Sequence, residues 1–424
     1  MISATTFRPG PLRGAVTVPG DKSISHRALI VGASQPDELL IHNLNPGRDV
    51  LATANALRVI GAEVRANGTS AIVRGGTLHA PQTAIDCMNS GSTARMMLGV
   101  LSGANLGAQF DGDSSLRRRP MEPVAAQLRA FGARIDTTNG TLPLRLHGRE
   151  RVETQRFILI SQSAQIKSAL LFAGLYAGVP IRISNNKGSR DHTERLLRAF
   201  GADISIERDV IELRSCVRNI MPIRIPGDFS AAAFFIVAAT VAAGSNLTIT
   251  DVGVNPTRTG LIDALHTMGA DITFQNERED SGEPVADILV KHAALHPTTI
   301  GSDVALRMID EIPVFAVAAA FAHGETRILG VAELRNKESD RVAAIERMLA
   351  SAGVRTEMLP NGIAVHGGSP AAIDGAVVQP HDDHRTAMSV AALAAGSGRI
   401  GIDSDRAIDV SFPGFSEALA KVQA

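Results

Sequence analysis

The chain has 424 residues, of which 45% are hydrophobic and 20% are charged, and its formal net charge is −1. This composition is typical of a globular protein long enough for more than one domain, and it excludes a disordered chain. A nearly neutral chain with one Tyr and no Trp has little to offer nucleic acid, either as a positive field or for base stacking. Any strongly positive region must therefore be local.

The two cysteines, Cys87 and Cys216, have no CxxC partner, which is typical of a protein from a reducing compartment. The first residues do not read as a signal peptide, and the longest apolar run, residues 229–243, is shorter than the roughly 20 residues that a membrane span needs. We expect a cytoplasmic protein that does not enter a membrane.

Residues 19–27, PGDKSISHR, predict a turn that leads into a helix N-terminus. Asp21 or Ser23 can cap this helix, and its first unpaired N–H groups attract anions. Lys22 and Arg27 add two cations at an end where a helix ordinarily prefers acidic residues. A capped surface helix with stray basic residues explains the stretch equally well, and it is not a Walker A loop because no Gly directly precedes Lys22.

Two helix patterns repeat along the chain about every 70 residues. One ends in Leu-x-x-apolar-Gly-Ala-x-apolar, where the Gly suits a left-handed C-cap. The other opens with capping residues and continues into small apolar residues, which predicts a helix buried on all sides. The first pattern covers 57–64, 128–135, 197–204, 265–272, more loosely 349–354, and incompletely 415–422; the second begins near 21–23, 89–92, 161–163, 227–230, 310–313 and 382–385.

Three such units fill residues 20–225 and three fill 227–424, and 224–228 resembles the segment that ends at Asp21. We infer two similar α/β lobes with a cleft between them. Cations gather at the predicted helix starts, which in a nearly neutral protein indicates small ligands carrying phosphate or carboxylate. These cations are Lys22, Arg27, Arg95, Arg117, Arg118, Arg119, Lys167, Arg190, Lys337, Arg341 and Arg385.

Carboxylates among those cations are candidates for proton transfer, foremost Asp310 and Glu338. Asp310 can instead be a simple N-cap, and Glu338 can lie on a solvated helix face of mixed charge. The run His-Asp-Asp-His at 381–384 is a weak metal signal because its neighbours point in different directions. Cys87 is best explained as a small buried apolar residue.

Nine motifs, in order along nearly the whole chain, resemble those of the 5-enolpyruvylshikimate-3-phosphate synthase (3-phosphoshikimate 1-carboxyvinyltransferase) family. They are PGDKSISHR at 19–27, NSGSTAR at 89–95, RRP at 118–120, SAQIKSALL at 163–171, RDHTE at 190–194, NPTRTG at 255–260, DE at 310–311, KESDR at 337–341 and DHRTAM at 383–388.

The resemblance implies an α/β fold of two lobes, each built of three βαβαββ units in an inside-out barrel. It places the N-terminal lobe at 15–226, the C-terminal lobe at 1–14 and 227–424, and a hinge near 15–20 and 225–228. It also implies transfer of the enolpyruvyl group of phosphoenolpyruvate to the 5-hydroxyl of shikimate 3-phosphate, with release of phosphate. This is the sixth step of the shikimate pathway to chorismate and the aromatic amino acids, and we expect a monomer without cofactor or metal.

The resemblance also implies a role for each matching residue. Asp310 would accept the proton of the attacking hydroxyl, and Glu338 with Lys22 would protonate the enol carbon and assist the leaving phosphate. The residues implied for shikimate 3-phosphate are Lys22, Ser23, Arg27, Ser163, Ala164, Gln165, Arg190, Asp310 and Lys337; those for phosphoenolpyruvate are Lys22, Gly91, Arg119, Gln165, Arg341 and Arg385.

Three positions, Met96, Glu333 and Val410, depart from the commoner family pattern, and together with RDHTE they resemble the subgroup that tolerates the inhibitor glyphosate. Gly91 is instead the small residue associated with sensitivity. The nearest alternative is the enolpyruvyl transferase that acts on UDP-N-acetylglucosamine. That enzyme would show Lys-Asn in the first motif and a Cys in the mobile loop, whereas here Ser23 follows Lys22 and residues 111–120 lack Cys.

Overall fold

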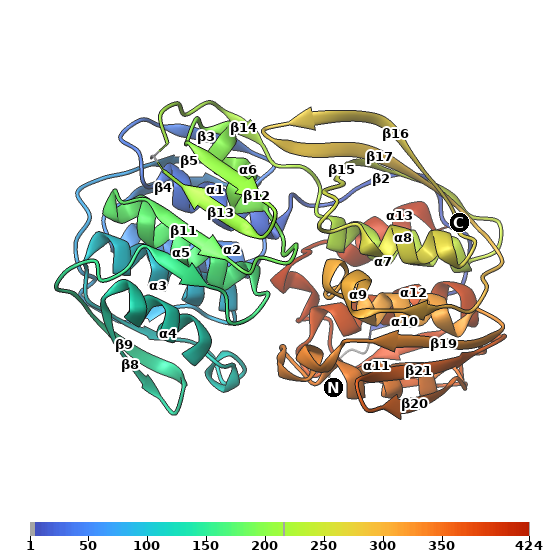
Figure 1. The fold of residues 1–424 in the computed structure, drawn as a ribbon. Helices are drawn as coiled ribbons and strands as arrows, with labels where there is room; N and C mark the ends of the chain where they lie inside the picture. The colour runs from blue at the N-terminus through green and yellow to red at the C-terminus, as the bar shows by residue number, and fades with distance from the viewer. Residues whose placement is uncertain (1–4, 215–216, 424) are drawn as a thin grey trace. The chain divides into compact units, whose positions relative to one another are not determined.

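The structure is a computed structural model that describes residues 5–214 and 217–423, so Cys216 lies outside the described residues. The chain divides into two compact units, each with its own hydrophobic core (Figure 1). The N-terminal unit comprises Gly20–Ile225 and the short segment Glu279–Glu283. The C-terminal unit comprises the described residues up to Pro19, Pro226–Arg278, and those from Pro284 onward.

Three buried helices form the centre of the N-terminal unit, and each begins at a predicted cluster of polar residues. The second and third pack closely because a Cβ at Gly99 or Gly103 would overlap the backbone of the facing helix. These inner helices are α1 (Lys22–Gly32), α3 (Gly91–Ala104) and α5 (Ala164–Ala177); the outer ones are α2 (Arg48–Val59), α4 (Glu122–Phe131) and α6 (His192–Ala199), with the short η1 (Leu116–Arg118).

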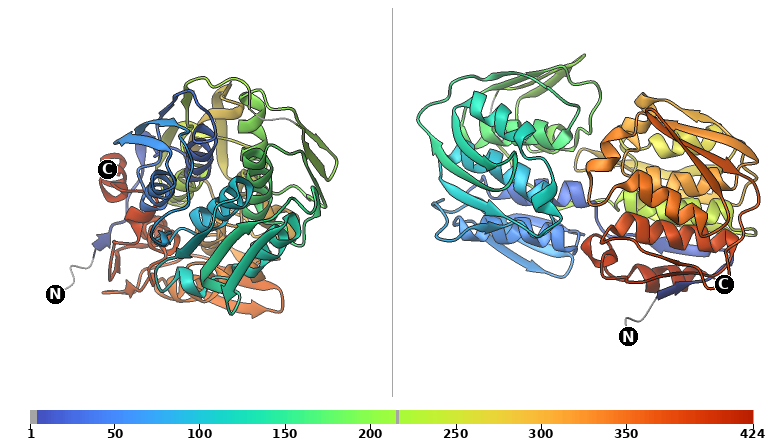
Figure 2. Two further views of the ribbon diagram at one scale, coloured as in Figure 1. Left: turned by 90° about the vertical axis from the view of Figure 1, so that its left-hand side faces the viewer. Right: turned by 90° about the horizontal axis from the view of Figure 1, so that it is seen from below.

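Sheets of four strands lie around these helices, as Figure 1 and the two further views in Figure 2 show. Each combines one parallel pair with antiparallel strands. Their orders are β14-β3-β5-β4, β6-β7-β9-β8 and β10-β11-β13-β12. The strands are β3 (Leu39–His42), β4 (Glu63–Asn67), β5 (Ser70–Arg74), β6 (Ile85–Asp86), β7 (Ala108–Asp111), β8 (Ala133–Thr138), β9 (Thr141–Arg149), β10 (Arg156–Ile158), β11 (Ile181–Ser184), β12 (Ile204–Glu207), β13 (Val210–Leu213) and β14 (Ile223–Arg224).

The C-terminal unit repeats the plan, and every residue of two of its inner helices, α7 and α10, is buried. Such helices carry no polar face, so their exposed chemistry is confined to their ends. The inner helices are α7 (Phe229–Val241), α10 (Ile312–Ala320) and α12 (His384–Ser397); the others are α8 (Gly260–Thr267), α9 (Ser302–Arg307), α11 (Arg341–Ala350), α13 (Phe415–Val422), η2 (Ala332–Asn336) and η3 (Ile408–Val410).

The sheets of this unit are ordered β16-β17-β15-β2, β18-β19-β21-β20 and β1-β23-β22, again with one parallel pair in each. Strands β1 and β2, near the N-terminus, therefore complete sheets whose other strands come from residues 246–402. The strands are β1 (Thr5–Phe7), β2 (Arg13–Thr17), β15 (Asn246–Gly253), β16 (Asp271–Asp280), β17 (Glu283–Lys291), β18 (Thr299–Ile300), β19 (Gly324–Leu329), β20 (Arg355–Leu359), β21 (Gly362–Gly367), β22 (Val377–Val378) and β23 (Ile400–Ile402).

The repeated glycine signature ends five outer helices as predicted. Gly61, Gly132, Gly201, Gly269 and Gly353 have φ between 72° and 114°, the left-handed region that glycine enters without strain. Together with the six small sheets of the described residues, this confirms the predicted α/β fold and its sixfold internal repeat. No helix among the described residues is both long and apolar enough to span a membrane.

Candidate active site

Lys22 is held in place at the start of α1. Asp21 caps this helix by accepting a hydrogen bond from the N–H of Ile24 at 2.9 Å. The ammonium of Lys22 lies 2.8 Å from Oδ2 of Asp49, in the first turn of α2, and only 14% and 9% of these two side chains are exposed. The capped turn and the carboxylate together fix the ammonium at the helix start.

Two arginines lie beside the start of α3, where Ser90 caps the helix and Gly91 is its first residue. A Cβ on Gly91 would lie 2.6 Å from a terminal guanidinium nitrogen of Arg95 and 3.5 Å from one of Arg119. Glycine at this position therefore leaves both guanidinium groups against the unpaired N–H groups of the helix. That arrangement favours an anion.

Gln165, in the first turn of α5, joins this group to the third inner helix. Its side-chain N–H₂ donates to Ser92 Oγ at 2.9 Å, and its Oε1 accepts from Arg95 at 2.7 Å. Ser163 occupies the N-cap position and Ala164 begins the helix, and Ser163 makes no side-chain capping bond within the described residues. The starts of α3 and α5 are thus held side by side.

Arg27 is 3% exposed and reaches three helices of the N-terminal unit. It donates to Thr193 Oγ1 at 2.7 Å, Ser168 Oγ at 2.8 Å and the carbonyl of Ser23 at 2.8 Å. Burial lowers the pKa of Arg27 to about 10, against the opposing effect of Glu194, so the guanidinium stays charged at neutral pH. These three hydrogen-bond partners are neutral, and within residues 5–214 and 217–423 no carboxylate forms an ion pair with Arg27.

A fully buried ion pair lies behind Arg27. Lys167 Nζ lies 2.7 Å from Oε1 of Glu194 and also donates to the carbonyl of Ser189 at 3.1 Å. Both charged side chains have no exposed surface. Arg190 lies close enough to Arg27 to oppose its charge, and His192 Nδ1 contacts Glu283 at 2.7 Å. The RDHTE motif therefore supplies the charged groups around the start of α6.

In the C-terminal unit, Arg341 contacts three carboxylates. Its Nε lies 2.8 Å from Asp383, one terminal nitrogen lies 3.2 Å from Asp310, and the other lies 2.6 Å from Glu338. Burial opposes the charge of Arg341, but Asp383, Glu338 and Asp310 outweigh it and raise the pKa of the guanidinium. The two predicted proton-transfer residues thus share one buried cation.

A second arginine, Arg385, extends this cluster at the start of α12. It lies 3.5 Å from Oδ2 of Asp310 and 3.8 Å from the buried carboxylate of Glu311. Glu311 also accepts a hydrogen bond from Ser230 and lies 3.7 Å from Arg258, which belongs to the NPTRTG motif. The starts of α7, α10 and α12 are joined by these contacts.

Lys337, next to Glu338 in sequence, forms a 3.0 Å ion pair with Glu333, whose side chain is 65% exposed. Glu311, rather than Asp310, occupies the N-cap position of α10, so the alternative that Asp310 is a simple cap is wrong. Glu338 is 18% exposed and paired with Arg341, so it is not on a solvated helix face either.

Comparison with known proteins gives a family for this arrangement. The model of the EPSP synthase (3-phosphoshikimate 1-carboxyvinyltransferase) family matches residues 7–419. The chain belongs to this family. A 3-phosphoshikimate 1-carboxyvinyltransferase of Gloeobacter violaceus is 47% identical over 423 residues, covering 97% of each chain, and one of Pelotomaculum thermopropionicum is 46% identical over 421 residues, covering 97% of this chain and 96% of that one.

Among solved structures, EPSP synthase from Acinetobacter baumannii is 37% identical, with a TM-score of 0.85, and the match covers 99% of this chain and 98% of that one. The match confirms the fold of the EPSP synthase family for this chain. The names of these relatives favour 3-phosphoshikimate 1-carboxyvinyltransferase over the alternative that acts on UDP-N-acetylglucosamine.

The sequence did not reveal three residues that contact the predicted site residues Lys22 and Arg27. They are Asp49, Ser168 and Thr193. Asp49 is in the first turn of α2, where an acidic residue is ordinary, so its pairing with Lys22 left no signal. Ser168 and Thr193 contact Arg27 from far along the chain. Only the positions of Ser168 and Thr193 inside the family motifs at 163–171 and 190–194 could have drawn attention to these two residues.

The weaker candidates do not form sites. Among residues 5–214 and 217–423, no His, Cys, Asp and Glu side chains are grouped to hold a metal ion. In the 381–384 run, Asp383 is buried against Arg341, whereas His381 and Asp382 are exposed. Burial raises the pKa of the Cys87 thiol, which makes it unreactive.

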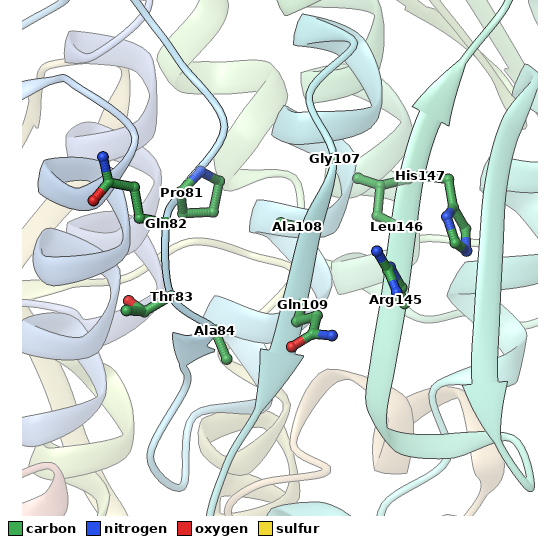
Figure 3. Close-up of a pocket in the computed structure, with 10 residues that line it drawn as sticks. All are labelled: Pro81, Gln82, Thr83, Ala84, Gly107, Ala108, Gln109, Arg145, Leu146 and His147. Atoms are coloured by element: carbon green, nitrogen blue, oxygen red, sulfur yellow. The ribbon is translucent and has the colours of Figure 1, made fainter.

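A pocket of about 550 Å³ opens elsewhere, between residues 81–84 and strands β7 and β9 (Figure 3). Its polar side chains, among them Gln109 and Arg145, lie on the exposed face of the β6-β7-β9-β8 sheet. None of the residues predicted for the EPSP synthase substrates lines it.

Proposed function

We propose that this chain transfers the enolpyruvyl group of phosphoenolpyruvate to the 5-hydroxyl of shikimate 3-phosphate, giving 5-enolpyruvylshikimate 3-phosphate and phosphate. The observation that carries the proposal is that, in a member of the EPSP synthase family, cations gather at buried helix starts in both units. Such preorganised charges can hold two anionic substrates and the tetrahedral intermediate between them.

Shikimate 3-phosphate is assigned to residues at or near the starts of α1, α5 and α6 and to two residues of the C-terminal unit. Arg27 supports this assignment best, because it is buried, charged and bonded to neutral groups. The full set is Lys22, Ser23, Arg27, Ser163, Ala164, Gln165, Arg190, Asp310 and Lys337.

Phosphoenolpyruvate is assigned to Lys22, Gly91, Arg119, Gln165, Arg341 and Arg385. The two guanidinium groups that an added Cβ at Gly91 would approach, those of Arg95 and Arg119, support this assignment in the N-terminal unit. The buried Arg341 supports it in the C-terminal unit.

The reaction needs an acceptor for the hydroxyl proton and a donor for the methylene carbon of phosphoenolpyruvate. Asp310 accepts the proton as the hydroxyl oxygen attacks C2, and Glu338 with Lys22 protonates C3. Loss of a proton from C3 and of phosphate from C2 then regenerates the double bond. Neither step calls for a metal or an organic cofactor, so a chelator should leave the activity intact.

We place the lobes at 15–226 and at 1–14 with 227–424, with a hinge near 15–20 and 225–228. Support comes from the two compact units, between which the chain passes after Pro19 and after Ile225. We further propose a cytoplasmic monomer whose partners are its two substrates.

The test is release of phosphate from phosphoenolpyruvate by the purified chain. Release should depend on added shikimate 3-phosphate and should not be supported by UDP-N-acetylglucosamine. Replacing Glu338 with Gln should lower turnover far more than substrate binding. Release driven by the UDP sugar instead would refute the assignment.

A further inference from the structure

The hydroxyl of Thr53, in α2, bonds away from its own helix. A buried helical threonine often donates to the carbonyl four residues earlier, as Thr240 does in α7 at 2.8 Å. For Thr53 that carbonyl belongs to Asp49, and it accepts instead from Thr93 Oγ1 of α3 at 3.2 Å. Thr53 Oγ1 lies 2.7 Å from Thr93 Oγ1 and 2.7 Å from Nδ1 of His26 in α1. Thr53 therefore joins α2 to two inner helices.

Four side chains, those of His26, Thr53, Thr93 and Ser90, form this hydroxyl network, and none of them has exposed surface. Thr93 Oγ1 also donates to Ser90 Oγ at 2.8 Å. Water does not compete for bonds in such surroundings, and a buried hydroxyl that loses its partner costs free energy. The network is therefore held in one arrangement.

The single proton of each hydroxyl sets the direction of the network. The carbonyl of Asp49 can only accept, so Thr93 donates its proton, shared between that carbonyl and Ser90 Oγ. Thr53 then donates to Thr93 and accepts from His26. Burial holds the pKa of His26 well below its usual value, so the imidazole is neutral and carries its one proton at Nδ1.

The hydroxyl network ends at two helix starts that carry residues assigned to phosphoenolpyruvate. Ser90 caps α3 by accepting from the N–H of Thr93 at 3.1 Å, and Gly91 is the first residue of that helix. Asp49, in the first turn of α2, holds the ammonium of Lys22 at 2.8 Å. The position of Gly91 relative to Lys22 thus depends on hydroxyl bonds between α2 and α3.

We propose that Thr53, oriented by His26, is a positioning residue for phosphoenolpyruvate, because its hydroxyl fixes the start of α3 relative to Lys22. This inference rests on the proposed function. Thr53 and His26 are both buried, so they act through Thr93 and not by contact with the substrate.

The effect should be larger for phosphoenolpyruvate than for shikimate 3-phosphate. Arg27, the residue that best supports the second assignment, is held by Ser168 of α5 and Thr193 of α6, which lie outside the hydroxyl network. A purely structural role of Thr53 would instead lower stability without distinguishing the two substrates. The ratio of the two KM values therefore separates a positioning role from a structural one.

The first experiment replaces Thr53 with Val, which keeps the shape of the side chain and removes the hydroxyl. We expect KM for phosphoenolpyruvate to rise about tenfold and KM for shikimate 3-phosphate to change by less than about threefold. Thr53→Ser keeps the hydroxyl and should restore most of the affinity. Thr240→Val is the matched control, since it removes a fully buried helical hydroxyl that bonds within α7, and it should change neither KM.

A second experiment tests the direction of the hydroxyl network in the wild-type protein. NMR of isotopically labelled histidine shows which imidazole nitrogen of His26 carries the proton, and His26→Gln identifies its signal. We expect the proton at Nδ1. A neutral imidazole with its proton at Nε2 would make Thr53 the donor to His26 and Thr93 the donor to Thr53. Thr93 would then have no proton for Asp49, and the inference would be overturned.

Equal KM values for phosphoenolpyruvate in Thr53→Val and Thr240→Val would also overturn the inference, as would an equal rise in both KM values of Thr53→Val. Should Thr53→Val fail to fold, the position of the proton on His26 still decides. The proposed function would stand in each case. It would fail only if the wild-type protein released no phosphate in the presence of shikimate 3-phosphate, so the two failures are distinguishable.

Discussion

The ammonium of Lys22 lies 2.8 Å from Oδ2 of Asp49, and both side chains are largely buried. The backbone carbonyl of Asp49 in turn accepts from Thr93 of α3 at 3.2 Å. A residue in the first turn of an outer helix thus links the starts of two inner helices. Asp49 thereby sets the position of the Lys22 ammonium, to which we assign roles in both substrate binding and proton transfer.

Replacing Asp49 with Asn should lower kcat/KM while leaving the fold intact. The amide cannot balance the ammonium, so Lys22 will move from the position that the carboxylate gives it. A displacement of about 1 Å costs on the order of 100-fold in rate. Steady-state kinetics measure the loss, and Glu38→Gln, which removes the partner of the exposed Arg65, is the control. Unchanged kinetics in Asp49→Asn would show that Lys22 does not depend on this pair.

The sequence predicted the inner helices well because burial on all sides leaves a direct mark on composition. Residues 229–241, for example, contain only small and apolar residues apart from Ser230 and Thr240. The outer helices were equally visible through their terminal glycines. Both signals are local, so they do not depend on knowing which elements meet.

Partnerships between distant residues could not be predicted in this way. The sequence around Asp49 does not indicate that this residue pairs with Lys22. The sequence around Arg341 likewise does not indicate that its guanidinium contacts both Asp310 and Asp383. Such contacts depend on how the repeats pack. The family resemblance supplied the names of the residues at the site, and the structure supplied the partners that hold several of them.

The buried ion pair of Lys167 and Glu194 should contribute strongly to the free energy of unfolding. Lys167→Met leaves the carboxylate of Glu194 buried without its cation, which costs about 3–5 kcal/mol in the free energy of unfolding. Lys167→Met/Glu194→Gln removes both charges and should recover most of that loss. Urea unfolding measures both values. If the double variant were as unstable as the single one, the loss of stability would come from the side-chain packing of Lys167 and not from its charge.

Replacing Gly91 with Ala should weaken phosphoenolpyruvate binding without destabilising the fold. The new Cβ would meet a terminal nitrogen of Arg95 at 2.6 Å, and a flexible side chain can move away at little cost. The guanidinium of Arg95 then shifts from the anion site, whereas Arg119, 3.5 Å from the new Cβ, need not move. We expect KM for phosphoenolpyruvate to rise about tenfold.

The control for this substitution is Gly368→Ala, because a Cβ at Gly368 meets no atom within 4 Å. It should change neither KM nor the melting temperature. If Gly91→Ala instead left KM for phosphoenolpyruvate unchanged and altered only that for shikimate 3-phosphate, the assignment of Gly91 would be wrong.

His26 should make the protein less stable as the pH falls below neutrality. The imidazole is completely buried on α1, and its Nδ1 lies 2.7 Å from Thr53 Oγ1. Burial, followed by the charges of Lys22 and Arg27, holds the pKa of His26 well below 6.5. In the unfolded chain the same group takes up a proton near pH 6.5, so the unfolded state binds more protons below that pH.

The free energy of unfolding should therefore fall with decreasing pH, from pH 6.5 down to the lowered pKa, by up to about 1.4 kcal/mol per pH unit from this group. His26→Gln removes the titration and keeps a polar group that can reach Thr53, so its stability should depend less steeply on pH over that range. Urea unfolding between about pH 5.5 and pH 7.5 measures both slopes. His79→Gln, at an exposed position, should keep the slope of the wild-type protein. Parallel slopes for His26→Gln and the wild type would mean that His26 becomes protonated within the folded protein, and the neutral imidazole inferred from its burial would then be incorrect.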